Sequence, residues 1–396
     1  MKAVVETRDI AGDSLPPTVV RLGWVSFLTD VSSEMIVPLL PAFLATTLGA
    51  PASALGWIEG VAETTASFVK IASGRLTDRA PAKKPLVLLG YGLSSLVRPL
   101  IGLATIWPVV LALRFVDRIG KGIRTAPRDT LIAAAVPLER RGAAFGLHRA
   151  FDNAGAVLGP LLASLLVVAF GFSMKTVFLL SIVPGALSFL VLVTGVPETA
   201  APPAPEGTGT VAPLPGAFWR VAGVLTFFTL AASSDTFILL RARELGAPPA
   251  ALPLLWSMSH AVRSAFGRLG GGLSDRFGRK RLILVGWALY AICYAAFGAV
   301  RSLGALVAVL AVYSLYAPLT EGAEKALAAD LVPAASRGRA FGWLSGMTGL
   351  AALPASVLFG TLWQHAGAGT AFLTGAAIAG VATALLSILE VRPASG

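Results

Sequence analysis

Charge is scarce in this sequence. Only 13% of its 396 residues are charged, whereas soluble proteins carry about a quarter, and 55% are hydrophobic. These charged residues are too few to cover the surface of a water-soluble fold. Apolar runs of about 20 residues, the length that crosses a hydrocarbon core of about 30 Å, recur from one end of the chain to the other. These features exclude a soluble domain with a single anchor and predict an all-α protein that crosses the membrane many times.

Cysteine and histidine are scarce too. The only cysteine, Cys293, lies in an apolar run, which excludes an intramolecular disulfide and a cysteine metal cluster. The three histidines, His148, His260 and His365, do not have the sequence spacing of zinc ligands. The phosphate-binding pattern Gly-x-x-x-x-Gly-Lys-Ser/Thr is absent, which argues against ATP hydrolysis by this chain. We therefore expect no metal site and no cofactor.

The net charge of +11 comes from basic residues in short loops between the apolar runs. Basic loops stay in the cytoplasm and set membrane topology, so we expect these charges to meet a lipid bilayer and not nucleic acid. They follow every second apolar run, and the loops between them are nearly bare of charge. We therefore expect both termini to be cytoplasmic, in a cell membrane of the bacterial inner-membrane type. The basic loops contain Arg75, Arg79, Lys83 and Lys84; Arg140 and Arg141; Arg276, Arg279, Lys280 and Arg281; and Arg337 and Arg339.

The apolar runs form two groups of six on either side of a stretch rich in Pro, Ala, Gly and Thr. This stretch, 197–217, has no apolar periodicity and is predicted to be a flexible cytoplasmic linker. It separates an N-terminal bundle at 19–196 from a C-terminal bundle at 218–390, with cytoplasmic tails at 1–18 and 391–396. The expected spans are 20–48, 53–73, 85–105, 108–130, 142–170 and 174–195, then 218–240, 249–271, 281–300, 304–328, 338–364 and 369–390.

The two groups repeat each other in sequence. The segment GRLTDR at 74–79 matches GGLSDR at 271–276, an offset of 197 residues. The segment PLERRGAAFG at 137–146 matches PAASRGRAFG at 333–342, an offset of 196 residues. Two independent motifs thus give nearly the same offset. With six spans per group, the two halves must have the same orientation in the membrane.

The second copy of the first motif resembles the signature of the major facilitator superfamily. Its residues are Gly271, Asp275, Arg276, Gly278, Arg279 and Lys280. The first copy retains Gly74, Asp78 and Arg79 but has Ala80, Pro81 and Ala82 where the signature places a Gly-Arg pair. The resemblance extends over essentially the whole chain. It implies twelve transmembrane helices in two pseudo-symmetric six-helix bundles around a central cavity, working as a monomer by alternating access. It also implies that the motif is a cytoplasmic latch, although simple anchoring by positive charge is an alternative.

A second motif, GAVLGP at 155–160, resembles the glycine-proline motif of antiporters in this family. Gly155 and Gly159, four residues apart, permit close approach of another helix, and Pro160 removes a backbone donor and favours a bend. These properties suit the interface of a rocking movement. Ordinary tight packing is the alternative interpretation. The resemblance favours export.

Ionisable residues interrupt the apolar runs, mostly in the first half. Each costs about 3 kcal/mol or more at mid-span, so such residues usually face a cavity, form pairs or carry function. Residues four apart lie on one helix face, which puts Asp30 with Glu34, Glu59 with Glu63 and Arg114 with Arg118. We expect the first half to carry the coupling and the second to supply a more apolar wall. The candidate coupling and substrate residues are Asp30, Glu34, Glu59, Glu63, Arg98, Arg114, Asp117, Arg118 and His260.

Asp30, Glu34 and Glu63 are the expected proton-binding residues, with Arg114 as their modulator. A carboxylate that alternates between an apolar environment and one beside an arginine changes its affinity for a proton. The alternative is that these charges form static salt bridges between spans. His260 titrates in the right range for coupling, but a lone histidine is as readily explained by packing. His148, Arg149 and Asp152 are interpreted as an internal cluster.

Together these patterns predict a secondary active transporter and not an enzyme. Excess acid in the first half favours proton-coupled efflux of a small amphipathic or cationic compound. The alternative is proton-coupled uptake of a small organic anion, which Arg98, Arg114 and Arg118 would bind. A membrane-embedded enzyme is the competing class, but the sequence offers no nucleophile with a neighbouring base, and an enzyme does not explain the repeat.

Overall fold

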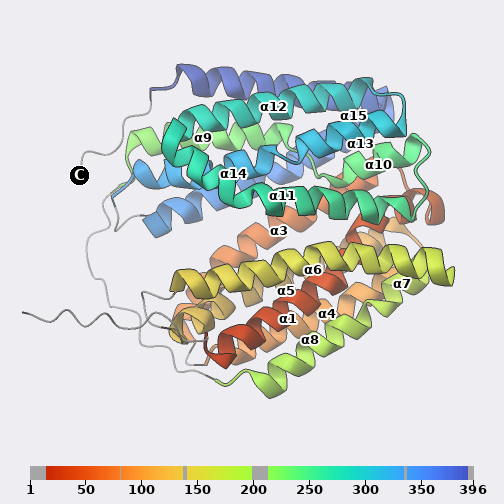
Figure 1. Cartoon of the computed structure of the whole chain (residues 1–396), viewed down its shortest axis with the longest axis vertical. Coiled ribbons are helices and arrows are strands. Elements are labelled where there is room, and N and C mark those ends of the chain that lie inside the picture. Colours follow the sequence, from red (N-terminus) through yellow and green to blue (C-terminus); the bar gives the residue numbers. More distant parts are fainter. Residues whose placement is uncertain (1–14, 81, 137–140, 199–212, 334–336, 391–396) are drawn as a thin grey trace, which may run out of the picture.

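The computed structural model describes residues 15–80, 82–136, 141–198, 213–333 and 337–390. This part of the chain is helical, with short turns between the helices and no strand. Figure 1 shows the N-terminal half, red to yellow-green, beside the C-terminal half, green to blue. The linker predicted at 197–217 falls mainly on 199–212, and the tails predicted at 1–18 and 391–396 fall largely or wholly on residues that lie outside the described part.

The helices of each half follow the predicted apolar runs closely. The N-terminal half contains α1 (Pro17–Glu34), η1 (Val37–Leu39), α2 (Leu40–Ala42), η2 (Phe43–Thr47), α3 (Ala52–Arg79), α4 (Lys84–Leu100), η3 (Ile101–Leu103), α5 (Trp107–Ala134), α6 (Arg141–Phe170), α7 (Met174–Leu180) and α8 (Ile182–Gly195). The C-terminal half contains α9 (Gly216–Ala231), α10 (Thr236–Glu244), α11 (Ala251–Phe277), α12 (Arg279–Ala299), α13 (Leu303–Tyr313), α14 (Tyr316–Asp330) and α15 (Arg337–Ile388).

Eight helical segments of the described residues are long and apolar enough to cross a membrane. Three further helices of 27 or 28 residues, α3, α5 and α11, have the length but carry several charges each. Gly367 has φ 84° and ψ 165° and divides α15 into two rods. The all-α membrane fold is therefore confirmed. Taken with the breaks within them, the described helices group into twelve consecutive helical segments. That all twelve cross the bilayer stays a prediction.

Two pairs of helices join the halves. α3 packs on α15 through small residues: a Cβ on Gly56 would lie 2.3 Å from the Ser356 oxygen, and one on Gly349 would lie 2.2 Å from the Ser67 Cβ. α6 packs on α11, which it follows along the border between the halves in Figure 1. Only glycine leaves room for this approach, so the two halves meet backbone to backbone.

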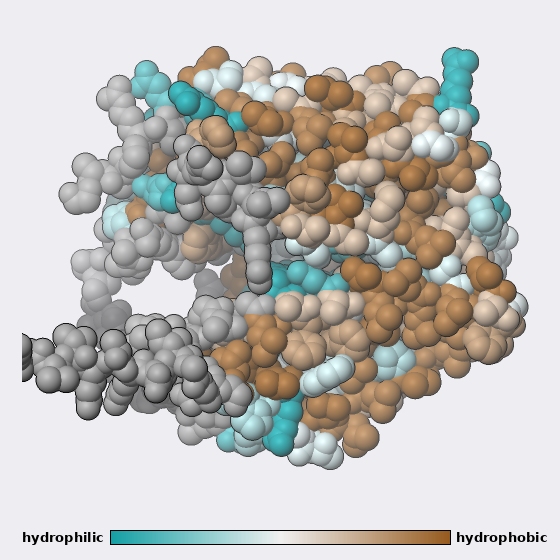
Figure 2. Space-filling model, viewed as in Figure 1, coloured by the Kyte–Doolittle hydropathy of each residue, from teal (hydrophilic) through white to brown (hydrophobic). Residues whose placement is uncertain are grey.

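The halves separate toward one end of the molecule, where Figure 2 shows an opening between them. We call this the basic end, because α4 begins there at Lys84, directly after Lys83, and α12 begins there with Arg279 and Lys280. Gly74 on α3 and Gly342 on α15 are near it, and nothing lies within 4 Å of a Cβ built on either. At the opposite end the Ser164 hydroxyl of α6 donates to the Ala250 carbonyl oxygen at 2.8 Å. In Figure 2 hydrophilic residues lie at the seam between the halves, and hydrophobic residues dominate the rest of the visible face.

Candidate functional site

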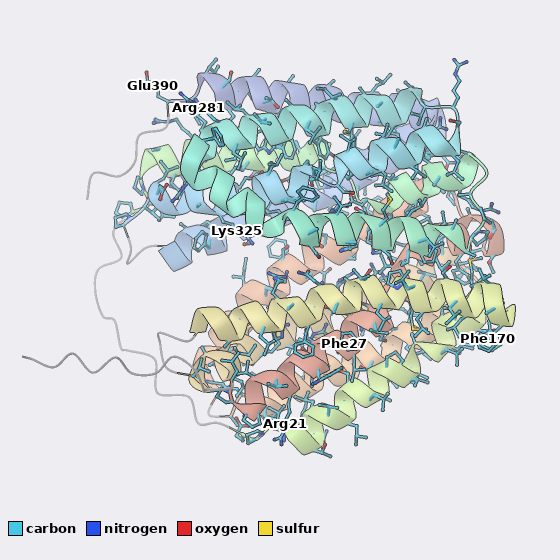
Figure 3. All side chains as sticks on the ribbon, viewed as in Figure 1. Arg21, Phe27, Phe170, Arg281, Lys325 and Glu390 are labelled. Atoms are coloured by element: carbon cyan, nitrogen blue, oxygen red, sulfur yellow. The ribbon has the colours of Figure 1, made fainter. Side chains whose placement is uncertain are left out.

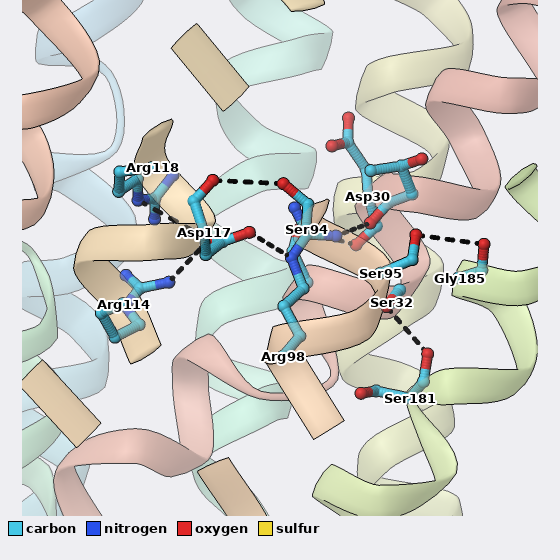
Figure 4. Close-up of polar contacts among 12 residues, drawn as sticks. Asp30, Ser32, Ser94, Ser95, Arg98, Arg114, Asp117, Arg118, Ser181 and Gly185 are labelled. Carbon is cyan, nitrogen blue, oxygen red and sulfur yellow. Dashed lines mark hydrogen bonds and ion pairs between the residues drawn. The ribbon is translucent and has the colours of Figure 1, made fainter. Parts of the chain in front are cut away.

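The Asp117 carboxylate of α5 is the centre of the charged cluster in the N-terminal half. Oδ1 accepts from the Arg98 Nε of α4 at 2.8 Å, and Oδ2 lies 3.7 Å from Arg114 Nη1 and 4.0 Å from Arg118 Nε. Arg98 also donates from Nη1 to the Thr29 carbonyl oxygen of α1 at 3.0 Å. Figure 4 shows this arrangement. Asp117 and Arg98 thus connect α1, α4 and α5.

Glu59 of α3 bridges the two halves. One carboxylate oxygen accepts from Arg114 Nη2 at 3.1 Å, and the other accepts from the Ser234 hydroxyl at 3.3 Å. Ser234 lies in the break between α9 and α10, in the other half. A continuous set of polar contacts therefore runs from Asp117 through Arg114 and Glu59 to the C-terminal half.

Glu34 makes the second contact of this kind. Its Oε2 accepts from the Trp256 Nε1 of α11 at 2.7 Å, so Trp256, one of the aromatic side chains of the second half, holds an acid of the first. Trp256 in turn lies against His260, with ring centroids 5.2 Å apart. The structure thus places His260 next to the Glu34 contact.

Asp30 and Glu63 differ from the other acids. Among the described residues neither carboxylate has a hydrogen bond or an ion pair. Asp30 is half-buried in α1 and is within electrostatic range of Lys121 and Arg124, whereas Glu63 is exposed and is within range of Arg118 and Lys121. Arg114, the predicted modulator, contacts Glu59 and Asp117 and makes no ion pair with either of these two acids.

The glycine-proline motif packs against the two predicted proton-binding residues of α1. A Cβ on Gly155 would lie 2.6 Å from the Phe27 oxygen and 2.9 Å from the Asp30 Cβ. One on Gly159 would lie 2.8 Å from the Val31 oxygen and 2.9 Å from the Glu34 Cβ. Close packing against these two glycines therefore positions both acids. Pro160, the last residue of the motif, lies inside α6.

Two basic residues of α5 that are not among the candidates predicted from the sequence also belong to this site. Lys121 is within electrostatic range of Glu63 and Asp30, and Arg124 donates from Nη1 to the Ser94 hydroxyl at 3.0 Å and lies over the Tyr91 ring at 4.3 Å. Spacing could have identified them, because Arg114, Asp117, Lys121 and Arg124 recur every three or four residues on one helix face.

In the C-terminal half a comparable cluster of described residues lies at the break between α9 and α10. Asp235 accepts from Arg263 Nη2 at 2.6 Å and from the Tyr313 hydroxyl at 2.6 Å. Arg263 comes from α11 and Tyr313 from α13, so the pair joins three helices. Asp235 and Arg263 thus form an ion pair that links the break between α9 and α10 to α11.

The motif predicted to be a latch lies at the basic end. Gly278 has φ 88°, in the left-handed region that favours glycine, and turns the chain from α11 into α12. Arg279 donates to the Ala326 carbonyl oxygen at 2.6 Å and pairs with Asp330, and Lys280 donates to the Ser387 oxygen at 2.8 Å. These contacts stay within the C-terminal half. Gly74 and Gly271 lie within α3 and α11, while the side chains of Asp78, Arg79, Asp275 and Arg276 lie outside the described residues.

Two overlapping segments, residues 22–240 and 222–396, match the family model of the Major Facilitator Superfamily. The chain belongs to this superfamily. An uncharacterised MFS-type transporter of Methanocaldococcus jannaschii is 34% identical over 383 residues, which cover 94% of each chain. The multidrug resistance protein MdtH of Citrobacter koseri is 23% identical, over 78% of this chain and 77% of its own. The protein is therefore a multi-pass membrane transporter and not an enzyme, as the sequence predicts.

Solved transporters share its fold. A bacterial homologue of the human lysosomal transporter Spinster, in an inward-facing and occupied conformation, superposes with a TM-score of 0.77 at 17% identity, covering 96% of this chain and 97% of that one. The nucleoside transporter NupG gives a TM-score of 0.75 at 14% identity, covering 95% of this chain and 100% of that one. At such identities the likeness concerns the fold alone.

Proposed function

We propose that this transporter exports small amphipathic or cationic compounds in exchange for protons. Asp30 is the principal proton-binding residue, with Glu63 and Glu34 in support. The observation that carries the proposal is the state of Asp30: it is half-buried in a membrane-spanning helix, without a hydrogen bond or ion pair among the described residues. A carboxylate in that setting is costly when charged, so binding a proton or a cationic compound relieves the cost.

The contacts of the other acids support a division of roles. Asp117 and Glu59 are paired with arginines, so their charge is already compensated and they serve as structure. Glu34 is bound to Trp256 across the two halves, so its protonation state is coupled to their separation. Since the halves separate at the basic end, which positive charge predicts to be cytoplasmic, we assign this arrangement to the inward-facing state.

Export also agrees with the names of some relatives. The curated proteins similar to this chain include MdtH and MdtG, which are named as multidrug resistance proteins. The alternative, uptake of an organic anion, requires free arginines. Arg98 and Arg114 are engaged with Asp117 and Glu59, which leaves Arg118 as the only one of the three predicted arginines with a single weak contact, at 4.0 Å.

The proposal is tested by proton release from the detergent-purified protein on addition of tetraphenylphosphonium, an amphipathic cation. We expect release from the parent and its loss in Asp30→Asn, with partial loss in Glu63→Gln and Glu34→Gln. Asp129→Asn is the control, because that side chain is 42% exposed and pairs with its neighbour Arg128. Release that persists in all three acid variants contradicts the proposal, and proton uptake with benzoate alone favours anion uptake through Arg98, Arg114 and Arg118.

A further inference from the structure

The C-terminal half contains a pocket that none of the proposed coupling residues lines. Its volume is about 430 Å³, within the range of sites that hold small molecules. It lies between α9, α14 and α15 toward the basic end, and Figure 3 places Lys325 on the side of this half that faces the N-terminal half. Its lining combines apolar side chains with carboxylates. The residues are Leu225, Phe228, Thr229, Glu321, Glu324, Lys325, Phe341, Leu344, Ser345 and Thr348.

Two carboxylates give the pocket its charge. Glu324 is held in place because its Oε1 accepts from the Trp287 Nε1 of α12 at 2.9 Å. Glu321 is exposed and, among the described residues, has no hydrogen bond or ion pair. Lys325 is the one basic residue of the lining, so two acids and one base leave a formal charge of −1. A fixed acid beside a free one, in a wall open to solvent, is suited to a positively charged ligand.

The rest of the wall is suited to an apolar body. Phe228 stacks on Trp287 with ring centroids 4.1 Å apart and an interplanar angle of 4°, so the two rings form a rigid surface. Phe341 of α15 also lines the pocket and is 37% exposed, so its ring offers further apolar surface to a ligand. The Thr229 and Thr348 hydroxyls donate to carbonyl oxygens of their own helices, at 3.2 and 2.9 Å, and so are not free donors for an anion.

We propose that this pocket is a separate binding site for a small organic cation with an aromatic or branched apolar body. Glu321 and Glu324 bind the charge, and Phe228, Phe341 and Leu344 contact the apolar part. The site receives the compound from the basic end, before it reaches Asp30 in the other half. This assignment rests on the proposed export of cations, but it is independent of proton coupling.

The test is equilibrium binding of tetraphenylphosphonium to the detergent-purified full chain. Intrinsic tryptophan fluorescence, to which Trp287 contributes as one of eight tryptophans, is a second readout. We expect Glu321→Gln to weaken binding about tenfold, because the cation loses a charged partner. Lys325→Gln should strengthen binding, since it removes the repelling charge. Triphenylphosphine oxide, a neutral compound of similar shape, should bind weakly and equally to the parent and to both variants.

Glu321→Gln is the informative variant because the Glu321 side chain has no hydrogen-bond or ion-pair partner among the described residues to lose. Glu324→Gln replaces the charged acceptor of Trp287 Nε1 by a neutral amide, so this variant is interpreted only if its fluorescence and melting temperature match those of the parent. Asp129→Asn, which lies outside the pocket and the proposed proton site, should bind tetraphenylphosphonium within about twofold of the parent. If Glu321→Gln binds as the parent does and Asp30→Asn loses binding, the proposed pocket site is contradicted and the proposed export function is not. A parent that binds benzoate but not tetraphenylphosphonium overturns both.

Discussion

At the scale of single residues, Asp117 has the largest share of buried charge contacts. It is 1% exposed and lies against Arg98, Arg114 and Arg118. Asp117→Asn would leave three arginines close together without their counter-charge. We expect a loss of about 3–5 kcal/mol in the free energy of unfolding, as when one partner of a buried ion pair is removed. Thermal unfolding in detergent measures it.

The matched control for that change is Asp129→Asn on the same helix. Its ion pair with Arg128 is partly exposed, and such pairs contribute about 0–1 kcal/mol. An Asp117→Asn protein that melts at the parent temperature contradicts the structural role assigned to Asp117, and would return this acid to the candidates for coupling.

Gly155 is a residue where one methyl group matters. Gly155→Ala places a Cβ 2.6 Å from the Phe27 oxygen and 2.9 Å from the Asp30 Cβ, so α1 must move and carry Asp30 with it. We expect the variant to fold but to lose most proton release on addition of tetraphenylphosphonium. Gly223→Ala, where nothing lies within 4 Å of the new Cβ, should behave like the parent. Full release from Gly155→Ala would separate the glycine motif from coupling.

At the scale of elements, the turn between α11 and α12 depends on one backbone conformation. Gly278 has φ 88°, and any side chain there costs about 1–2 kcal/mol. We expect Gly278→Ala to lower the free energy of unfolding by this amount and to disturb Arg279, which joins α12 to the end of α14. Gly216→Ala, in open space at the start of α9, is the control. Equal stability of the two variants would mean that the turn can adopt another shape.

At the scale of the whole molecule, contact between the halves is set by α3 and α15. Gly56→Leu cannot fit, because the Ser356 oxygen already lies 2.3 Å from a Cβ at that position. We expect the variant to populate a state in which the halves separate at the end opposite the basic end. Spin labels are attached to Lys175→Cys and Arg301→Cys in a Cys293→Ser background. Electron paramagnetic resonance should then report a longer distance between the two labels. Gly223→Leu is the control, and an unchanged distance in Gly56→Leu would exclude α3 and α15 as the closing contact.

Much of the fold follows from residues that are near each other in the sequence. Helix bounds depend on runs of apolar residues and on turns such as Gly278, and these are local properties. Spacing along α5 is enough to place Lys121 and Arg124 on a charged helix face, but the partners of Arg124, Ser94 and Tyr91, are contributed by another helix. The pairing of charges is not a local property either. Several acids and several arginines could form many different ion pairs, and the orientation of each helix relative to its neighbours determines which of these pairs form.

The sequence by itself determined the class of this protein. Low charge, repeated apolar runs, two motifs offset by 196 and 197 residues and one superfamily signature are enough to identify a two-bundle transporter. Only the tertiary structure decided which acids are compensated and which are not. It set Asp117 among three arginines, Glu59 and Glu34 against the other half, and Asp30 against Gly155 without a partner among the described residues. The physical reason is that ion pairs form across a few ångströms, between helices that are far apart along the chain.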